Sequence, residues 1–250
     1  MRALPALLAG VLAITSLNVA ANIVVGADDR MSLGGGVADL GCTDVIVDGV
    51  FDLGGGTLRG VRNVEIRAGG QLLAGGAATI SLAGNWSNRG AFDPGNGSVS
   101  FVDGPGCASA STISGGSTFF ALSIVSSSGK PYQFEAGSTQ RVIRTLTLQG
   151  TASAPLQIGS TVPGQQGNVH LDGVQQMSML AVHDMRATGE WLALGLTNLY
   201  VGSNDNVYRW FGVPVVPTLE RGLLFVLMLA LGCTGLMLRT ARRPFLKERK

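Results

Sequence analysis

Short alternating runs of hydrophobic and polar residues follow one another along the middle of the chain. Gly, Asn, Asp or Ser bound these runs, and a period of two is typical of half-buried β-strands. No segment before residue 222 keeps the 3.6-residue period of an amphipathic helix. We therefore predict strands at 44–48, 50–53, 64–67, 71–73, 78–82, 98–102, 119–125, 142–148, 155–158 and 168–171.

The hydrophobic centres of these strands recur at distances that suit stacked coils. Ile66 and Ile80 are 14 residues apart, and the steps to Val99, Leu122 and Leu146 are 19, 23 and 24 residues. A unit of roughly 20 residues that stacks on its neighbours defines a β-solenoid. Small residues beside the strands suit tight corners, and long hairpins with Asn-Gly or Asp-Gly turns are lacking. We predict an all-β parallel β-helix, with a β-sandwich binding module as the alternative.

The two ends of the chain predict export. Arg2, the apolar stretch 4–17 and the small residues Val19-Ala20-Ala21 form a signal peptide over 1–21, so the mature chain is expected to begin near Asn22. If this segment is not cleaved, it acts as a signal anchor instead.

The C-terminal end has the pattern of a membrane anchor. Residues 222–238 carry no charge, and these 17 residues are the short end of a transmembrane helix. The tail 239–250 carries six Lys and Arg residues, among them Arg239, Arg242 and Arg243, against one acid. Positive flanks stay in the cytoplasm, so the preceding residues are expected outside it. A C-terminal core helix is the alternative.

The formal net charge hides an acidic body. It is +2 overall, but residues 239–250 contribute +5 and Arg2 contributes +1, which leaves −4 for the residues between them. Nucleic-acid binding needs a basic surface, so we exclude nucleic acid as a partner.

Three cysteines are present, and Cys233 lies inside the apolar span. Cys42 and Cys107 form a disulfide in an exported domain if the fold brings their Cα atoms within about 7 Å, which the sequence leaves open. They have no neighbouring His or Cys and so predict no metal site.

Many parallel β-helices cleave polysaccharides with paired carboxylates. Asp44 and Asp48 would share one face if their strand is continuous, whereas the neighbours His183 and Asp184 would face opposite sides of a strand. Since no acid/base pair has a supporting constellation, we predict no catalytic residue and no cofactor. A carbohydrate-active β-helix enzyme, either a polysaccharide lyase or a hydrolase, is the alternative. The sets considered are Asp44/Asp48/Asp52, Asp93/Asp103, and His183-Asp184 with Glu190, while 203–206 is interpreted as a surface turn rather than a calcium site.

Residues 84–101, Gly-Asn-Trp-Ser-Asn-Arg-Gly-Ala-Phe-Asp-Pro-Gly-Asn-Gly-Ser-Val-Ser-Phe, resemble a recurrent signature of bacterial surface proteins of parallel β-helix type. The further elements of that pattern match 112–116, 119–124, 146–148 and 208–211. The resemblance implies a right-handed β-helix body over 84–211, to which 22–83 add N-terminal coils or a cap.

The segment 212–221 is predicted to be a linker with a sorting motif. Val216, Pro217, Thr218, Leu219 and Gly222 resemble the IPTL-CTERM sorting signal, although Glu220-Arg221 stand where that signal has three residues including a Trp. The resemblance implies processing by an exosortase-type membrane enzyme.

Together these features predict an exported protein of the cell envelope with a structural, adhesive or surface-binding role. It would be anchored in the inner membrane by its C-terminal helix or released to the cell surface or the extracellular space after processing. The expected partners are the membrane, the sorting enzyme, and surface glycans or other envelope proteins.

Overall fold

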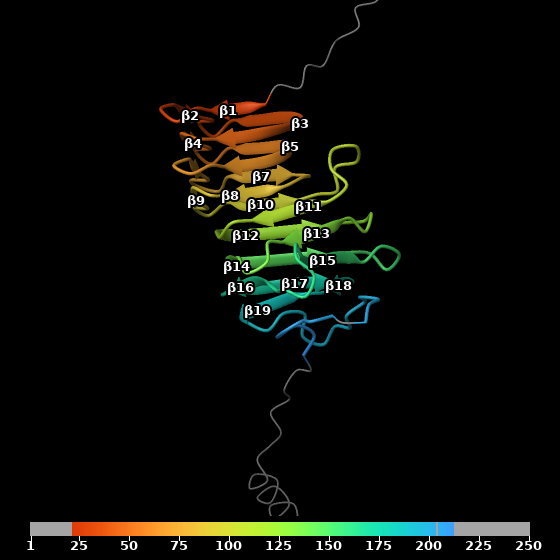
Figure 1. Ribbon diagram of the computed structural model, residues 1–250. Coiled ribbons are helices and arrows are strands. Elements are labelled where there is room, and N and C mark those ends of the chain that lie inside the picture. The colour runs from red at the N-terminus through yellow and green to blue at the C-terminus, as the bar shows by residue number, and fades with distance from the viewer. Residues whose placement is uncertain (1–21, 204, 213–250) are drawn as a thin grey trace, which may run out of the picture. The chain divides into compact units, whose positions relative to one another are not determined.

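The computed structural model describes residues 22–203 and 205–212, which form a stack of parallel β-coils (Figure 1). A 15-stranded sheet and a 4-stranded sheet hold the coils together, and successive coils pair in parallel along the stack. The predicted all-β parallel solenoid is therefore confirmed. The strands before residue 83, from β1 (Ile23–Val25) onward, belong to the same sheets as the strands after residue 84. The coils therefore continue across residues 83 and 84.

Each full coil contributes a strand to each of three faces, and the long strands β3, β5, β12 and β14 bend from one face to the next. Face 1 contains β1 (Ile23–Val25), the second parts of β3 (Val37–Val47) and β5 (Thr57–Ile66), β8 (Trp86–Asn88), β11 (Ser111–Ser114), β13 (Pro131–Phe134), β15 (Leu156–Ser160) and β18 (Leu180–Val182). Face 2 contains β2 (Arg30–Ser32), β4 (Val50–Asp52), β6 (Gln71–Leu73), β9 (Ala91–Asp93), the first parts of β12 (Ser117–Val125) and β14 (Thr139–Gln149), β16 (Gly167–Leu171) and β19 (Met185–Gly189). Face 3 contains the first parts of β3 and β5, β7 (Thr79–Leu82), β10 (Ser98–Phe101), the second parts of β12 and β14, and β17 (Val174–Ser178).

The register confirms three of the four steps between hydrophobic centres that were used to define the coil. Val99 pairs with Ile80 on one side and with Leu122 on the other, and Leu122 pairs with Leu146. The step from Ile66 to Ile80 is wrong, because Ile66 pairs with Val47 and Asn88 on face 1. Ile66 and Ile80 belong to different faces, and alternation alone does not distinguish the faces of a coil.

The core is a continuous column of inward-facing side chains. On face 3 the inward positions of β7, β10, β12 and β14 are all buried, with side chains at most 2% exposed, and they comprise Ile80, Val99, Leu122 and Leu146 in one row and Leu82, Phe101, Ile124 and Leu148 in the next. Each coil thus covers the apolar surface of its neighbours, as a solenoid requires.

Glycines form the tight corners between face 1 and face 2. Gly49, Gly70 and Gly90 occupy this corner in successive coils. A Cβ atom on Gly70 would overlap the carbonyl oxygen of Val47, and one on Gly90 would overlap the carbonyl oxygen of Gly70. Only a residue without a side chain lets the coils approach this closely. The expectation that small residues mark the corners is confirmed here.

The longer connections lie at the corner between face 3 and face 1. They span 102–110, 126–130 and 150–155, and they project from one side of the stack (Figure 1). In the described residues, no helix is long and apolar enough to cross a membrane. The predicted signal peptide, sorting motif, transmembrane helix and basic tail lie outside the described residues, so these stay predictions.

Candidate functional site

The three aspartates of the first catalytic hypothesis lie in three separate ion pairs. Asp44 contacts Arg62 at 2.7 Å, Asp48 contacts Arg67 at 3.3 Å, and Asp52 contacts Arg30 at 3.2 Å. Asp52 also accepts a hydrogen bond from the backbone of Gly54. Each carboxylate is therefore paired with a different arginine, of which Arg67 also pairs with Glu65 at 3.0 Å, and the three do not converge on a common reaction centre.

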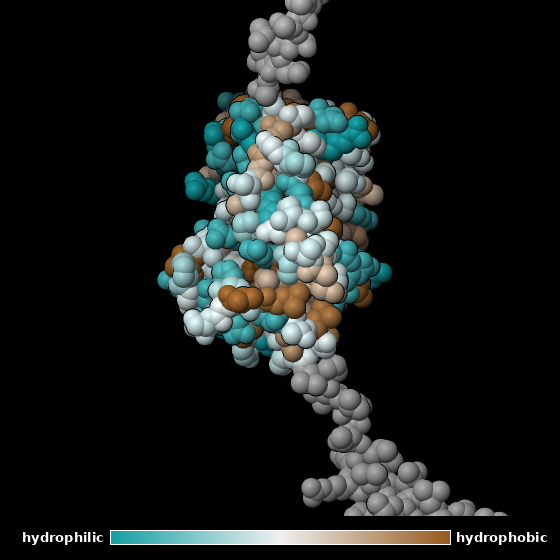
Figure 2. Space-filling view, turned by 90° about the vertical axis from the view of Figure 1, so that its right-hand side faces the viewer, coloured by the Kyte–Doolittle hydropathy of each residue, from teal (hydrophilic) through white to brown (hydrophobic). Residues whose placement is uncertain are grey.

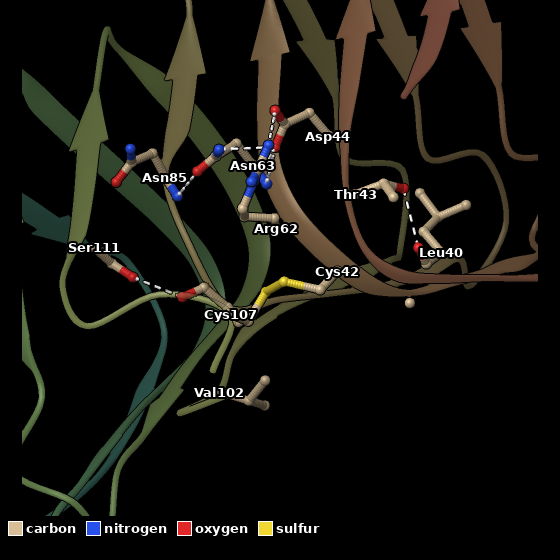
Figure 3. Close-up of a disulfide and its surroundings, with 12 residues drawn as sticks. Leu40, Cys42, Thr43, Asp44, Arg62, Asn63, Asn85, Val102, Cys107 and Ser111 are labelled. Atoms are coloured by element: carbon tan, nitrogen blue, oxygen red, sulfur yellow. Dashed lines mark hydrogen bonds and ion pairs between the residues drawn. A yellow bond between two sulfur atoms is a disulfide. The ribbon is translucent and has the colours of Figure 1, made fainter. Parts of the chain in front are cut away.

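Asp44 belongs to a ladder of side chains that caps successive coils at the start of face 1 (Figure 3). The Asp44 carboxylate accepts from Arg62 Nε at 2.8 Å, from Asn63 Nδ2 at 2.8 Å and from Asn63 N at 3.2 Å. Asn63 Oδ1 in turn accepts from Asn85 N at 2.7 Å, and Asn85 Oδ1 accepts from Thr112 N at 2.8 Å. This ladder satisfies backbone N–H groups at the corners, which is a structural role.

Replacing Asp44 by Asn is expected to lower the free energy of unfolding at pH 7 by on the order of 1 kcal/mol. Hydrogen bonds from Arg62 hold the pKa of Asp44 below its usual value of 3.8. A lowered folded-state pKa stabilises the protein above pH 4, and this stabilisation is lost as the pH falls through the folded-state pKa. Urea unfolding of wild type and D44N at pH 7 and at successively lower pH should therefore show a difference that shrinks in acid. A difference that does not depend on pH would contradict this role.

Asp93 and Asp103, the second hypothesis, also have separate roles. Asp93 Oδ1 accepts from Gly95 N at 3.0 Å in a turn of face 2. Asp103 lies on the loop 102–110, where its Oδ2 accepts from Ser127 N at 2.9 Å and from Ser128 N at 3.2 Å. Burial raises the pKa of Asp103, but the hydrogen bonds from Ser126, Ser127 and Ser128 outweigh burial and lower this pKa. The carboxylate is thus held ionised to tie two loops together.

A cavity of about 710 Å³ lies beside Asp103, between the loops 102–110 and 126–130. Lys130 lines it but is 5% exposed, and its Nζ donates to the carbonyl oxygens of Ala83 and Val102. Nζ also lies 5.1 Å from the centre of the Tyr132 ring. Burial lowers the pKa of Lys130, which the charge of Asp103 opposes. Two carbonyls and an aromatic face stabilise the ammonium form, so Lys130 anchors the corner and is no free nucleophile.

The third hypothesis requires a correction. His183 and Asp184 do not face opposite sides of a strand, because they form the corner between β18 and β19, where Asp184 has a φ of 51°. His183 Nδ1 lies 3.3 Å from Asp184 Oδ2, while Asn206 Nδ2 donates to Asp184 Oδ1 at 2.7 Å. Asp184 therefore fastens the segment 205–206 to the last full coil. Glu190 contributes a backbone N–H to Leu171 and joins no described side-chain pair of this group.

One polar cluster was not predicted from the sequence. His170 of β16 has two polar neighbours. Its Nδ1 lies 3.0 Å from Thr188 Oγ1 of β19, and its Nε2 lies 2.9 Å from Asp172 Oδ1. Asp172 also accepts from Arg141 at 2.7 Å, and these bonds lower the pKa of Asp172. The members lie up to 47 positions apart in the chain, so only the register of β14, β16 and β19 brings them together. No group of three or more potential metal-ligating side chains occurs among residues 22–203 and 205–212.

The disulfide that the sequence left open is present between Cys42 and Cys107, with Cα atoms 5.7 Å apart (Figure 3). Cys42 follows the first part of β3, whereas Cys107 lies three coils further along, in the loop 102–110. The loop folds back over the corners at Gly60 and Ala83 and encloses a groove of about 220 Å³ there. The bond therefore ties together coils that are far apart along the stack.

The outward side of face 3 presents aligned rows of small side chains. Thr79, Ser98 and Thr145 are aligned across neighbouring strands, and Ser81, Ser100, Ser123 and Thr147 form a second row. We call these residues of β7, β10, β12 and β14, with Ala121, the hydroxyl face.

By contrast, hydrophobic residues gather on the C-terminal part of the loop-bearing side (Figure 2), where Leu199, Tyr200 and Val201 border a cavity of about 340 Å³.

A scan against protein-family models, a search of curated proteins and a search of solved structures each gave no match. The resemblances to bacterial β-helix surface proteins and to IPTL-CTERM sorting signals therefore stay predictions.

Proposed function

We propose that this chain is an exported protein of the cell envelope, without catalytic activity, that uses the long faces of its solenoid for adhesion or surface binding. The disulfide between Cys42 and Cys107 is the main observation that supports the proposal of export. Disulfides persist in oxidising compartments and are rare in the cytosol. This support comes from the solenoid itself and is independent of the predicted segments at the two ends.

The distribution of carboxylates supports a role in binding rather than in cleavage. Asp44, Asp48 and Asp52 are engaged by different arginines, and Asp103 is engaged by backbone and hydroxyl groups of the neighbouring loop. A glycosidase or lyase needs two acid/base groups that face one substrate-binding groove. We also propose that the coils wind in a right-handed sense, which parallel crossovers adopt in about 98% of cases.

In this proposal residues 222–238 hold the protein at the inner membrane, with the basic tail 239–250 in the cytoplasm. Val216, Pro217, Thr218, Leu219 and Gly222 serve as the recognition motif of an exosortase-type enzyme, which releases the solenoid to the surface. Surface glycans or other envelope proteins are its binding partners.

Surface display can be tested with an epitope inserted between Ala152 and Ser153, which are exposed in a loop, the kind of site that generally accepts insertions. We expect antibodies to stain intact cells that carry this epitope. The matched control places the same epitope after Lys250, which should be stained only in permeabilised cells. Staining of the loop epitope only after permeabilisation would contradict surface display.

Mass spectrometry of the mature protein separates the two forms of attachment. We expect an N-terminus near Asn22 and, if the sorting enzyme cleaves, a C-terminus between Pro217 and Gly222. A mature chain that retains Lys250 would indicate a permanent membrane anchor instead of sorting.

A further inference from the structure

The hydroxyl face presents a two-dimensional array of Ser and Thr side chains. Its two rows run across β7, β10, β12 and β14, and every position in them except Ala121 carries a hydroxyl group. Neighbouring strands lie ~4.8 Å apart, and successive outward residues of one strand are separated by roughly 6.6 Å. The hydroxyl groups therefore repeat at near-constant intervals in two directions.

The hydroxyl face is an uncharged region of face 3, which carries the Asp39–Arg59 ion pair on the first parts of β3 and β5. No position of its two rows across β7, β10, β12 and β14 is charged. The outward side of face 1 carries Glu65 and the Asp44–Arg62 pair, and that of face 2 carries Arg141 and Asp172 at its edge. A surface without charge neither attracts nor repels ionic polymers by Coulomb forces, and it matches an uncharged ligand.

The array is held rigidly by the core behind it. The residues that alternate with the hydroxyls along the strands are Ile, Val, Leu and Phe with side chains at most 2% exposed. The pairing of β7 with β10 and of β10 with β12 continues without a register shift. Val102 and Val125, which are 38% and 43% exposed, extend β10 and β12 toward the loop-bearing corner. The face thus combines hydroxyl rows with an apolar margin.

We propose that the hydroxyl face binds an ordered surface of an uncharged polysaccharide, of which crystalline β-glucan is the simplest example. This inference rests on the proposed role in surface binding and names its ligand. A single hydroxyl hydrogen bond that replaces one to water contributes only about 0.5–1.5 kcal/mol. A free sugar would engage few of these groups and would bind weakly. An ordered array of chains offers both hydroxyl edges and apolar ring faces at repeating intervals, so many weak contacts form together.

The experiment measures depletion of the purified full-length protein, in a non-ionic detergent, by microcrystalline cellulose. The test variant is Ser100→Lys, which places a charge in the centre of the hydroxyl face. The matched control is Ser87→Lys, on an outward position of β8 in the same coil but on face 1. Ser100→Ala removes one hydroxyl without adding bulk, and thermal unfolding verifies that each variant is folded.

We expect wild type and S87K to bind cellulose equally, whereas S100K should raise the dissociation constant about tenfold. S100A should fall between them. Equal weakening by S87K, or no depletion of the wild type, would overturn the proposal. Retention of the wild type in a growing ice front without binding to cellulose would also overturn it, because the array would then match ordered water. These outcomes concern the purified protein, so they are distinct from failure of the proposed surface display, which the epitope staining reports.

Discussion

Replacing Cys42 by Ser is expected to lower the free energy of unfolding of the solenoid by about 4 kcal/mol. The bond joins residues 65 positions apart, and its loss lets the unfolded chain explore many more conformations. The folded state changes little in backbone strain, because Ser must adopt the same positive φ of 75° that Cys42 already has. Urea unfolding followed by circular dichroism measures the difference.

Controls make this result specific to the bond. C107S and the double variant C42S/C107S should lose the same free energy as C42S, since any of the three removes one bond. A reducing agent should shift the unfolding of the wild type to the same midpoint and leave C42S unchanged. Hydrogen exchange should increase most in the coils between Cys42 and Cys107, because each coil of a solenoid depends on its neighbours. An unchanged midpoint after reduction would contradict the role of the bond.

Replacing Trp86 by Ala should cost about 3–5 kcal/mol, the range for removing a large aromatic residue from a core. The Trp86 side chain is fully buried, and its ring lies 4.8 Å from that of Phe92 and 5.4 Å from that of Phe119. Its Nε1 donates to Ser117 Oγ at 2.9 Å, and Ser117 Oγ also accepts from Asn88 Nδ2 at 3.0 Å. The substitution therefore opens a cavity and removes one member of a buried hydrogen-bond network.

The matched control for this prediction is Trp191→Ala. Trp191 is 43% exposed, and the guanidinium of Arg209 lies 5.5 Å from its ring centre. We expect W191A to lose less than about 1 kcal/mol. W86F, which keeps most of the volume but loses the hydrogen bond, should fall between W86A and the wild type. If W86A and W191A unfolded at similar urea concentrations, the core around β8 would be less well packed than described.

The fold was predictable because the central coils have similar lengths. Alternation located the strands around Ile80, Val99 and Leu122, and the recurrent spacing indicated that they stack. Several short strands escaped prediction. Length alone does not explain this, because β1, β2 and β18 were missed although β4 and β6, which also have three residues each, were predicted. The signature over 84–101 now has physical reasons, since Asn85 continues the hydrogen-bond ladder, Trp86 fills the core and Gly90 forms a corner.

The candidate binding surface could not be predicted, because it depends on register. Ser81, Ser100 and Ser123 are separated by 19 and 23 residues, and serine is too common in this chain for that spacing to be noticed. The disulfide was left open for a related reason. Whether Cys42 approaches Cys107 is decided by the path of the loop 102–110 across the corners of the intervening coils, which no local pattern encodes.

The same bond has a mechanical consequence for a protein that is held at one end and pulled at the other. Tension along the chain passes through the two sulfur atoms and bypasses the residues between Cys42 and Cys107. That segment would otherwise lengthen the chain by up to roughly 220 Å when drawn out fully. A tether of this kind stays short under load, because the residues enclosed by the bond add no length to the chain.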